Sequence, residues 1–323
     1  MATIEHVFVD VGALRMHAAV AGPADGPAVL LCHGFPESWY SWRHQLEALA
    51  DAGYRVIAPD QRGYGQTDAP AEVEAYTQLH LVGDVVGLLE TLGIESATVV
   101  GHDWGGPVAW NAALLRPDVF HAVVGLSVPF GPRVPGATRP TEMMRSALGD
   151  GFLYILYFQD VGVAEAELDS DIRGTIRRIL YSLSGDIPPS EFRFFDPSAR
   201  SFKDLMREPE TLPDWLTDED LDVFTAEFER KGTFRHGLNW YRTIDRSWEL
   251  LAPFANAKVH QPALFIGAER DAIFGQTRES VAATKEWVPQ LREPVWVPDC
   301  GHWIQQEEPE IVNRALLDFL ASL

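Results

Sequence analysis

Short apolar runs alternate with segments of helical periodicity along the first 130 residues of the chain. The runs end in glycine or a polar residue and have the length of buried strands. Between them, residues 42–53 and 79–93 repeat apolar positions at helical spacing, and each segment ends in a glycine that stops a helix. Strands separated by helices of this length predict a parallel sheet with helices on both faces. The predicted strands of this part are "AVLLCHG" (28–34), "YRVIAPD" (54–60), "ATVVGHD" (97–103) and "AVVGLSVP" (122–129).

The alternation stops at "PFGPRVPGATRP" (129–140), where four prolines make a stiff, extended connection. A mostly helical block without a strong strand run follows. Strand signals resume at 263–271 and 293–302, and an amphipathic helix covers 309–323. A helical block therefore interrupts an α/β domain. The predicted organisation is an α/β core in two parts with an inserted helical cap: core 1–132, cap 133–250, core 251–323.

The composition is that of a globular protein with a strong acidic excess. The 323 residues include 47 Asp and Glu against 26 Lys and Arg, a net charge of −21. This balance disfavours nucleic acid and anionic membranes as partners. The longest apolar run, 152–158, is far short of the ~20 residues that span a bilayer. Two cysteines, Cys32 and Cys300, cannot form a disulfide framework, so we expect a cytoplasmic protein with two small buried thiols.

The stretch "VVGHDWGGPVAW" (99–110) has the pattern of a nucleophile elbow: a strand, Gly-x-nucleophile-x-Gly and a helix. Asp103 stands where a serine is usual. Asp271 and His302 also follow apolar runs, so all three residues lie at the carboxyl ends of predicted strands, where open α/β sheets place their sites. Nucleophile, acid and histidine in this chain order form the triad of the α/β-hydrolase fold, which we therefore predict.

The motif "HGFPES" (33–38) follows the first predicted central strand. In this fold the loop after that strand supplies one backbone N–H of the oxyanion hole, here that of Phe35. The residue after the nucleophile, Trp104, supplies the other. A tight turn whose glycine and proline serve geometry alone would also account for the motif. Both interpretations can hold, because the turn is what aims the N–H.

Four motifs together resemble the soluble-type epoxide hydrolases of the α/β-hydrolase superfamily: "HGFPESWYSWRHQ", "DQRGYGQTD", "GHDWGG" and "DCGHWIQQEEP". The resemblance covers nearly the whole chain and implies that the helical block is the family's cap. It also implies two cap tyrosines over the nucleophile, Tyr154 in "YILYFQ" and Tyr241 in "LNWYR", and a water-positioning carboxylate, Glu37. It implies no metal and no cofactor, with an epoxide and water as partners. Aromatic residues such as Trp104, Phe158 and Trp240 suggest that the epoxide is small and apolar. The side chains expected to line the substrate pocket are Phe35, Trp104 and Tyr157.

A carboxylate nucleophile suits an epoxide because the electrophile is a saturated ring carbon rather than a carbonyl. Attack by Asp103 forms an alkyl ester whose carbonyl belongs to the enzyme. Water activated by His302 then attacks this carbonyl, while the oxyanion hole stabilises the charge and Asp271 orients the imidazole. Proton donation from Tyr154 or Tyr241 compensates for the poor alkoxide leaving group. The predicted product is a vicinal diol.

Three other functions compete with this interpretation. Haloalkane and haloacetate dehalogenases use the same Asp nucleophile, but they lack the tyrosine pair, and haloacetate enzymes typically carry Arg where Trp104 stands. A non-catalytic ligand-binding protein of this fold has no need of both Asp271 and a correctly ordered His302. A dinucleotide-binding oxidoreductase would rest on "GYGQTD" (63–68), which lacks the last glycine of G-x-G-x-x-G. The scattered histidines form no metal-binding motif, and the oligomeric state, monomer or homodimer, stays open.

Overall fold

The computed structural model describes residues 3–149, 151–192, 196, 198–271, 273 and 278–323. Strands from this part of the chain form one eight-stranded sheet with the order β1-β2-β4-β3-β5-β6-β7-β8. The prediction of an α/β fold built on a mostly parallel sheet is confirmed. The strands are β1 Glu5–Val11, β2 Leu14–Ala21, β3 Ala28–Cys32, β4 Arg55–Pro59, β5 Ala97–His102, β6 Phe120–Leu126, β7 Ala263–Ala268 and β8 Val295–Val297.

The sheet is parallel except at its β1 edge. β1 and β2 form an antiparallel hairpin in which Val7 pairs with Ala18, and β2 runs antiparallel to β4. The remaining pairs, from β4 to β8, are parallel. The carboxyl ends of β3, β5, β7 and β8 therefore share one edge, and the predicted site residues of the core follow these ends. The helices around the sheet are α1 Arg43–Asp51, α2 Gln78–Thr91, α3 Gly105–Leu115, α11 Arg278–Ala283, α12 Ile304–Glu307 and α13 Pro309–Leu320.

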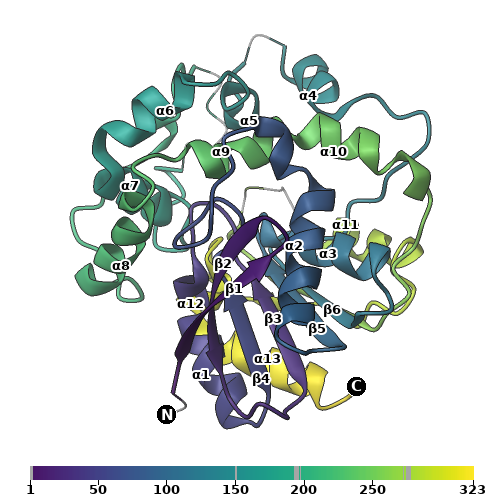
Figure 1. The fold of residues 1–323 in the computed structure, drawn as a ribbon. Coiled ribbons are helices and arrows are strands. Elements are labelled where there is room, and N and C mark those ends of the chain that lie inside the picture. The colour runs from purple at the N-terminus through teal and green to yellow at the C-terminus, as the bar shows by residue number, and fades with distance from the viewer. Residues whose placement is uncertain (1–2, 150, 193–195, 197, 272, 274–277) are drawn as a thin grey trace.

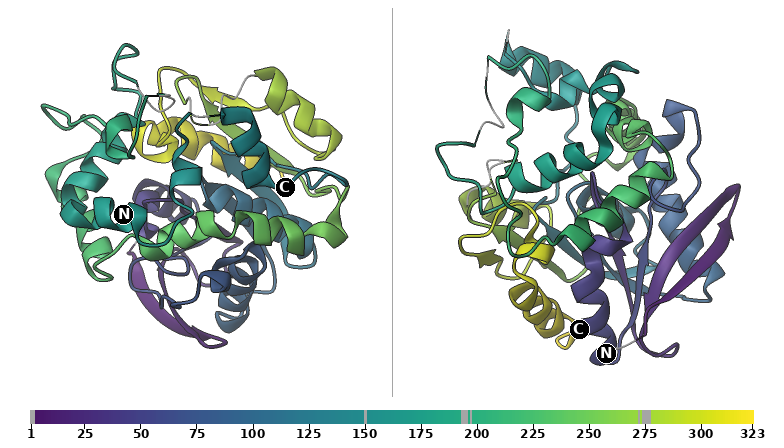
Figure 2. Two further views of the ribbon diagram at one scale, coloured as in Figure 1. Left: turned by 90° about the horizontal axis from the view of Figure 1, so that it is seen from above. Right: turned by 90° about the vertical axis from the view of Figure 1, so that its left-hand side faces the viewer.

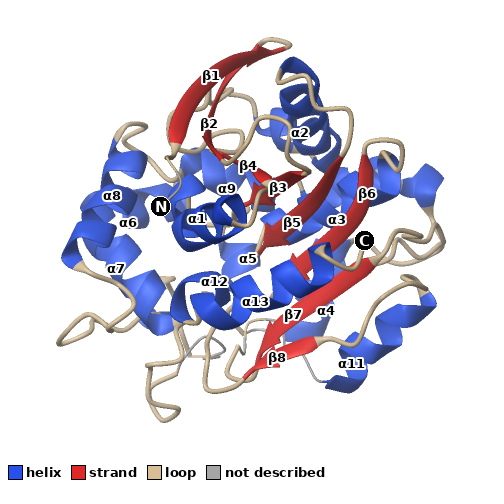
Figure 3. Cartoon of the chain, turned by 90° about the horizontal axis from the view of Figure 1, so that it is seen from below, coloured by secondary structure: helices blue, strands red, loops and turns tan. Residues whose placement is uncertain are grey.

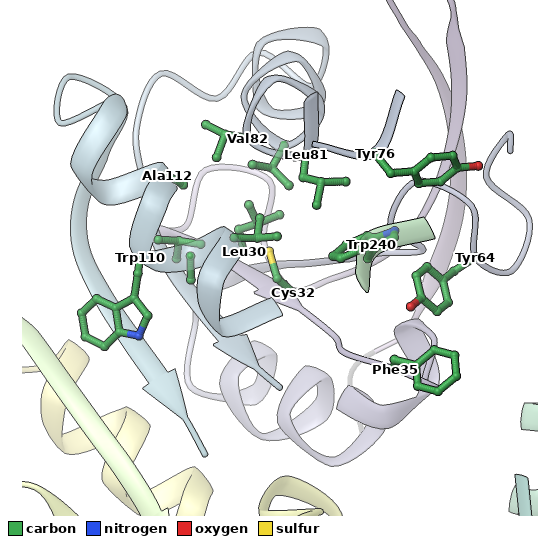
Figure 4. Packing of buried hydrophobic residues seen from close by; sticks show 14 of the residues in the cluster. Leu30, Cys32, Phe35, Tyr64, Tyr76, Leu81, Val82, Trp110, Ala112 and Trp240 are labelled. Atoms are coloured by element: carbon green, nitrogen blue, oxygen red, sulfur yellow. The ribbon is translucent and has the colours of Figure 1, made fainter. Parts of the chain in front are cut away.

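Alternate side chains of the strands enter two separate cores, one on each face of the sheet. In β3, Val29 and Leu31 pack in the core that includes side chains of α1 and α13. Leu30 and Cys32 belong to the other core, with Trp110 of α3 and side chains of α2 (Figure 4). This period of two is what a strand covered by helices on both faces requires. Figure 3 shows α1, α12 and α13 together on one face of the sheet.

A group of helices between β6 and β7 lies at the end of the sheet where the site residues gather (Figures 1 and 2). These helices fall within the range predicted as a cap, whose boundaries stay predictions. Among the described helices, none combines the length and the apolar character that a bilayer crossing needs. The helices of this group are α4 Pro140–Leu148, α5 Tyr154–Tyr157, α6 Val163–Leu168, α7 Ile172–Ser182, α8 Asp218–Glu229, α9 Arg235–Arg242 and α10 Ile244–Leu250. Short 3-10 helices cover η1 Trp39–Trp42, η2 Val73–Tyr76, η3 Asp169–Asp171, η4 Lys203–Leu205, η5 Ala252–Phe254 and η6 Thr284–Glu286.

Candidate active site

Asp103 occupies a sharp turn between β5 and α3. Its backbone has φ of 48°, in the left-handed region that residues other than glycine rarely adopt. The glycines on either side make the turn possible, because a Cβ at Gly101 would collide with the backbone of Gly105, and a Cβ at Gly105 would collide with Cys32. The strained turn between a buried strand and a helix is the nucleophile elbow that the sequence predicts.

The structure brings the three predicted triad residues together. His302 Nε2 lies 3.5 Å from Asp103 Oδ2, and His302 Nδ1 lies 3.0 Å from Asp271 Oδ2. All three side chains are buried. Their roles as nucleophile, base and orienting acid stay predictions, but the imidazole lies between the two carboxylates, hydrogen-bonded to Asp271 and within ion-pair distance of Asp103.

The carboxylates of Asp271 and Asp103 control the protonation state of His302. Burial alone would lower the pKa of this imidazole, but the charge of Asp271 and hydrogen bonds to both carboxylates raise it to about 10. Burial likewise works to raise the pKa of Asp271, yet the charge and hydrogen bond of His302 hold it below its usual range. At neutral pH the free protein therefore holds an imidazolium between two carboxylates.

The loop after β3 reaches the nucleophile through the backbone. The Phe35 N–H donates a hydrogen bond to Asp103 Oδ1 at 2.7 Å. The preceding Gly34 lies so close to Asp103 that a Cβ there would collide with its carboxylate. Trp104 precedes the first residue of α3, and its ring lies 4.9 Å from that of Tyr241. Of the two predicted oxyanion-hole donors, the Phe35 N–H thus already contacts the carboxylate. The role of the Trp104 N–H as the second donor stays a prediction.

Two phenols from the cap helices stand over Asp103. Tyr154 of α5 and Tyr241 of α9 are buried, with ring centroids 5.8 Å apart. Burial first, and then neighbouring groups that include the Asp103 carboxylate, raise the pKa of both phenols above the ordinary value. Both hydroxyls therefore keep their protons at neutral pH and can act as hydrogen-bond donors. Tyr154 and Tyr241 line the same cavity as Asp103, with a volume of about 160 Å³.

Tyr157 lies apart from this cavity. Its hydroxyl donates to Glu167 Oε2 at 2.7 Å, and its ring lines a separate hollow with Arg145 and Arg200. Among the described residues, the predicted pocket members that line cavities at Asp103 are therefore Phe35 and Trp104. Residues three apart share a face of an ideal helix, so helical spacing does not separate the two tyrosines. The hydrogen bond to Glu167 instead holds the Tyr157 side chain away from the cavity of Asp103.

Glu37 is fully buried and does not contact Asp103 directly. Its Oε2 accepts hydrogen bonds from Gly34 N–H and from His102 Nδ1, each at 2.9 Å. His102 Nε2 in turn lies 2.8 Å from the carbonyl oxygen of His302. Burial works to raise the pKa of Glu37, but the charge and hydrogen bond of His102 hold it below its usual range. The carboxylate thus connects the loop before Phe35 with the loop of His302, and its predicted role with water stays a prediction.

Two residues of this neighbourhood escape sequence reasoning. His102 precedes Asp103 directly, and its type alone suggests only a buried polar side chain. Glu307 follows the "GHW" motif, and its Oε2 accepts hydrogen bonds from Gly301 N–H and Gly185 N–H, both at 2.8 Å. Its Oε1 accepts another from Trp303 N–H at 2.9 Å. An acidic residue beside a catalytic motif is the available signal, but only the folded chain shows what it binds.

The remaining reactive side chains lie outside this chemistry. Cys32 and Cys300 are buried free thiols, as expected, and burial raises the pKa of both well above the ordinary value. In the part of the chain that the structure describes, no three His, Cys, Asp or Glu side chains converge in the manner of a metal site.

Comparisons with known proteins agree with this geometry. The profile of the alpha/beta hydrolase fold family matches residues 27–309, and the chain belongs to that family. Relatives within the family include epoxide hydrolases. Epoxide hydrolase A of Mycobacterium tuberculosis is 46% identical over 98% of this chain and 97% of its own length. Epoxide hydrolase 3 of Siraitia grosvenorii is 44% identical over 99% of both chains. The crystal structure of epoxide hydrolase A from Mycobacterium thermoresistibile superposes with a TM-score of 0.92, at 49% identity, over 99% of this chain and 98% of its own.

Proposed function

We propose that this protein is an epoxide hydrolase that converts an epoxide and water to a vicinal diol through an alkyl ester on Asp103. The observation that carries the proposal is the pair of buried phenols, Tyr154 and Tyr241, in the cavity of Asp103. A carboxylate nucleophile alone serves several reactions, whereas an oxygen leaving group also needs an acid beside it. The epoxide hydrolases among the relatives support the same assignment.

In the first step an oxygen of Asp103 bonds to a ring carbon while the bond from that carbon to the ring oxygen breaks. The ring oxygen takes a proton from Tyr154 or Tyr241. The resulting tyrosinate regains its proton from the imidazolium of His302, which lines a smaller cavity together with both tyrosines. His302 is then neutral, and Asp103 is an uncharged ester.

In the second step neutral His302 takes a proton from water as the water oxygen attacks the ester carbonyl of Asp103. The Phe35 N–H, already 2.7 Å from Asp103 Oδ1, stabilises the oxyanion that forms there, together with the Trp104 N–H. Collapse of this intermediate breaks the bond to the diol oxygen, which takes the remaining proton of the attacking water, so that the diol leaves and the carboxylate is restored. His302 ends as an imidazolium, so the cycle closes with the net addition of one water to the epoxide.

The proposal is tested by separating the two steps. In the variant His302→Gln the first step survives and the second stalls, so that the ester accumulates. Intact mass after mixing with styrene oxide should show a gain equal to the whole epoxide, mapped by peptide analysis to Asp103. The double variant Asp103→Asn/His302→Gln is the matched control and should gain nothing.

Two outcomes would contradict the proposal. A mass gain from a bromoalkane alone, short by HBr, would identify a dehalogenase. No adduct from either compound, combined with stoichiometric ligand binding, would identify a non-catalytic binding protein. The oligomeric state, monomer or homodimer, stays open, and the cytoplasmic location stays a prediction.

A further inference from the structure

Two cavities of very different size meet at the reactive groups. The larger measures about 160 Å³ and the smaller about 20 Å³. Asp103, Tyr154 and Tyr241 line both, so the nucleophile and the two acids stand at the boundary between them. A bound epoxide, with its oxygen on the phenols and one carbon against Asp103, would consequently direct its two carbons toward cavities of unequal capacity.

The larger cavity has room for one aromatic ring. An apolar protein cavity of ~150 Å³ is known to hold a benzene molecule. Apart from Asp103 and the tyrosines, this cavity is bounded by Trp104, Pro107, Val128, Met144, Ile155 and Ile244. None of these six side chains carries a charge, and five have no polar atom. The walls therefore favour an apolar substituent of about phenyl size.

The smaller cavity has no such room. A cavity needs ~10–15 Å³ to hold one water molecule, so about 20 Å³ admits a hydrogen, a methyl group or one water. Its far wall is formed by buried side chains of the cap, among them Ile179 of α7 and Phe202. The ring of Phe202 packs 5.0 Å from that of Phe158, which fixes this wall. His302 also lines the cavity, so the same space serves the water of the second step.

We propose that the protein selects epoxides that carry an apolar substituent of about phenyl size on one ring carbon and nothing larger than a methyl group on the other, and that it rejects epoxides with a bulky group on each ring carbon. This inference rests on the proposed function and names the substrate class of the same site. The large cavity takes the phenyl-sized substituent, and the other ring carbon faces the small cavity. Ile179 is then a specificity-determining residue, because it closes the space that a second substituent would need.

The test compares three epoxides that differ on one carbon: styrene oxide, trans-β-methylstyrene oxide and trans-stilbene oxide. The second adds a methyl group, which the small cavity admits, and the third adds a ring, which it does not. We expect kcat/KM for styrene oxide and trans-β-methylstyrene oxide to agree within about tenfold. We expect kcat/KM for stilbene oxide to be lower than that for styrene oxide by at least ~100-fold, since a single group that does not fit a pocket already costs ~10–200-fold.

Two isoleucines give a matched pair of variants. Ile179→Ala enlarges the small cavity and should raise the ratio of stilbene oxide to styrene oxide turnover by ~10-fold or more. Ile244→Ala makes the same change in the large cavity and should leave that ratio unchanged. Melting temperatures identify a misfolded variant, in which case Ile179→Val tests the same wall with a smaller change.

The outcomes separate this inference from the proposed function. Stilbene oxide turned over as fast as styrene oxide, or an equal response of the ratio to both alanine variants, would overturn the selectivity while leaving an epoxide hydrolase. Turnover of no epoxide at all would remove the proposed function itself.

A second, independent observation concerns the loops that hold the base. The segment after α7, residues 183–187, is bonded to both loops that carry the His302–Asp271 pair. His302 N–H donates to Leu183 carbonyl oxygen at 2.8 Å, and Arg270, next to Asp271, donates through Nη2 to Ile187 carbonyl oxygen at 2.7 Å. The backbones touch so closely that a Cβ at Gly301 would collide with Gly185. The carboxylate of Glu307 accepts hydrogen bonds from the backbone N–H groups of both Gly185 and Gly301.

Glu307 provides a fixed acceptor at this junction. Its two oxygens accept the N–H groups of Gly301 and Trp303, which flank His302, and of Gly185 in the cap. Burial raises the pKa of Glu307 to about 7, although these three N–H groups favour the charged form. We infer that Glu307 is a positioning residue that holds His302 in place for the second step, an inference that also rests on the proposed function.

Single-turnover kinetics of Glu307→Gln provide the test. The amide would place a donor against one of the three N–H groups and loosen the loop. We expect the rate of ester hydrolysis to fall ~10-fold or more, because ~1 Å of misplacement can cost ~100-fold in rate, while the rate of ester formation changes little. Glu308→Gln, one position along, is the control, and Glu307→Asp is the second variant if the first fails to fold. Equal loss in both steps would indicate a structural role alone, and no loss in either would overturn the inference.

Discussion

Alkylation of Asp103 should change the charge state of His302. In the free protein His302 lies between two carboxylates and has a pKa of about 10. Ester formation removes the charge of Asp103 and leaves only Asp271. The mechanism needs an imidazolium before this event and a neutral base after it. We therefore predict that loss of the Asp103 charge lowers the pKa of His302 toward neutrality.

The distance between the two groups sets the size of the effect. His302 Nε2 and Asp103 Oδ2 are 3.5 Å apart, and His302 is 1% exposed, so salt screens the pair little. At an effective dielectric constant of ~20, unit charges at this distance attract by roughly 5 kcal/mol. Since one pKa unit corresponds to about 1.4 kcal/mol, the pKa should fall by roughly 3 units. The remaining contact to Asp271, at 3.0 Å, keeps the imidazole basic enough to accept a proton from water.

The variant Asp103→Asn imitates the ester, because an amide is uncharged and has nearly the same shape. Ring-proton NMR titration would follow the pKa of His302 in both proteins. The chain has ten histidines, so the signal is assigned by its disappearance in His302→Gln. Peptide mass analysis confirms that the amide persists. A decrease of less than one unit in Asp103→Asn would refute the reasoning, because it would mean that solvent or structural relaxation screens the carboxylate.

Three further predictions follow from the same geometry. The double variant Tyr154→Phe/Tyr241→Phe should lower the rate of ester formation by ~10²–10⁴-fold in stopped-flow measurements, as expected for loss of a general acid, while ester hydrolysis persists. Because the folded protein raises the pKa of His302 from 6.5 to about 10, its protonation stabilises the fold below pH 6.5. The free energy of unfolding should fall as pH rises from 6.5 to about 10, and less so in Asp103→Asn, as measured with urea. Phe319→Ala, in the core beneath the sheet, should cost ~3–5 kcal/mol of stability without changing the substrate ratio.

The sequence could place the three residues of the predicted triad together because each lies at or shortly after a strand end, and strand ends have a clear signal. A buried parallel strand needs an apolar run, and its carboxyl end is marked by the first polar residue or glycine. Asp103 follows β5 directly, whereas Asp271 and His302 lie three and five residues beyond the last residues of β7 and β8, in the loops that leave the same edge of the sheet. Their chain order then fixes their relation, because the topology of a parallel sheet brings these ends to one edge. The elbow adds a local constraint, since glycines beside Asp103 have no other evident purpose in a strand-to-helix turn.

The features that escaped prediction depend on contacts between distant segments. The hairpin of β1 and β2 was outside the predicted strands, although "EHVFVDV" alternates apolar and polar residues, because an edge strand with a half-exposed face carries only a weak signal. The position of Tyr157 depends on its hydrogen bond to Glu167, which its place in the sequence does not show. Glu37 and Glu307 bind backbone N–H groups, and a backbone donor leaves no mark in the sequence. Residue type in the sequence thus predicts the groups proposed to react better than it predicts the residues that position them.

The two steps of the proposed reaction draw on different parts of the chain, and the cap contributes to both. Ring opening uses Tyr154 and Tyr241 from α5 and α9, whereas water attack uses His302, which the segment 183–187 fixes through Leu183. A rigid displacement of the whole cap would therefore move the acids and disturb the base together. The wall formed by Met144 and Ile244 is only half-buried and carries none of these contacts. A change in this wall should therefore alter the large cavity without disturbing the contacts that hold His302.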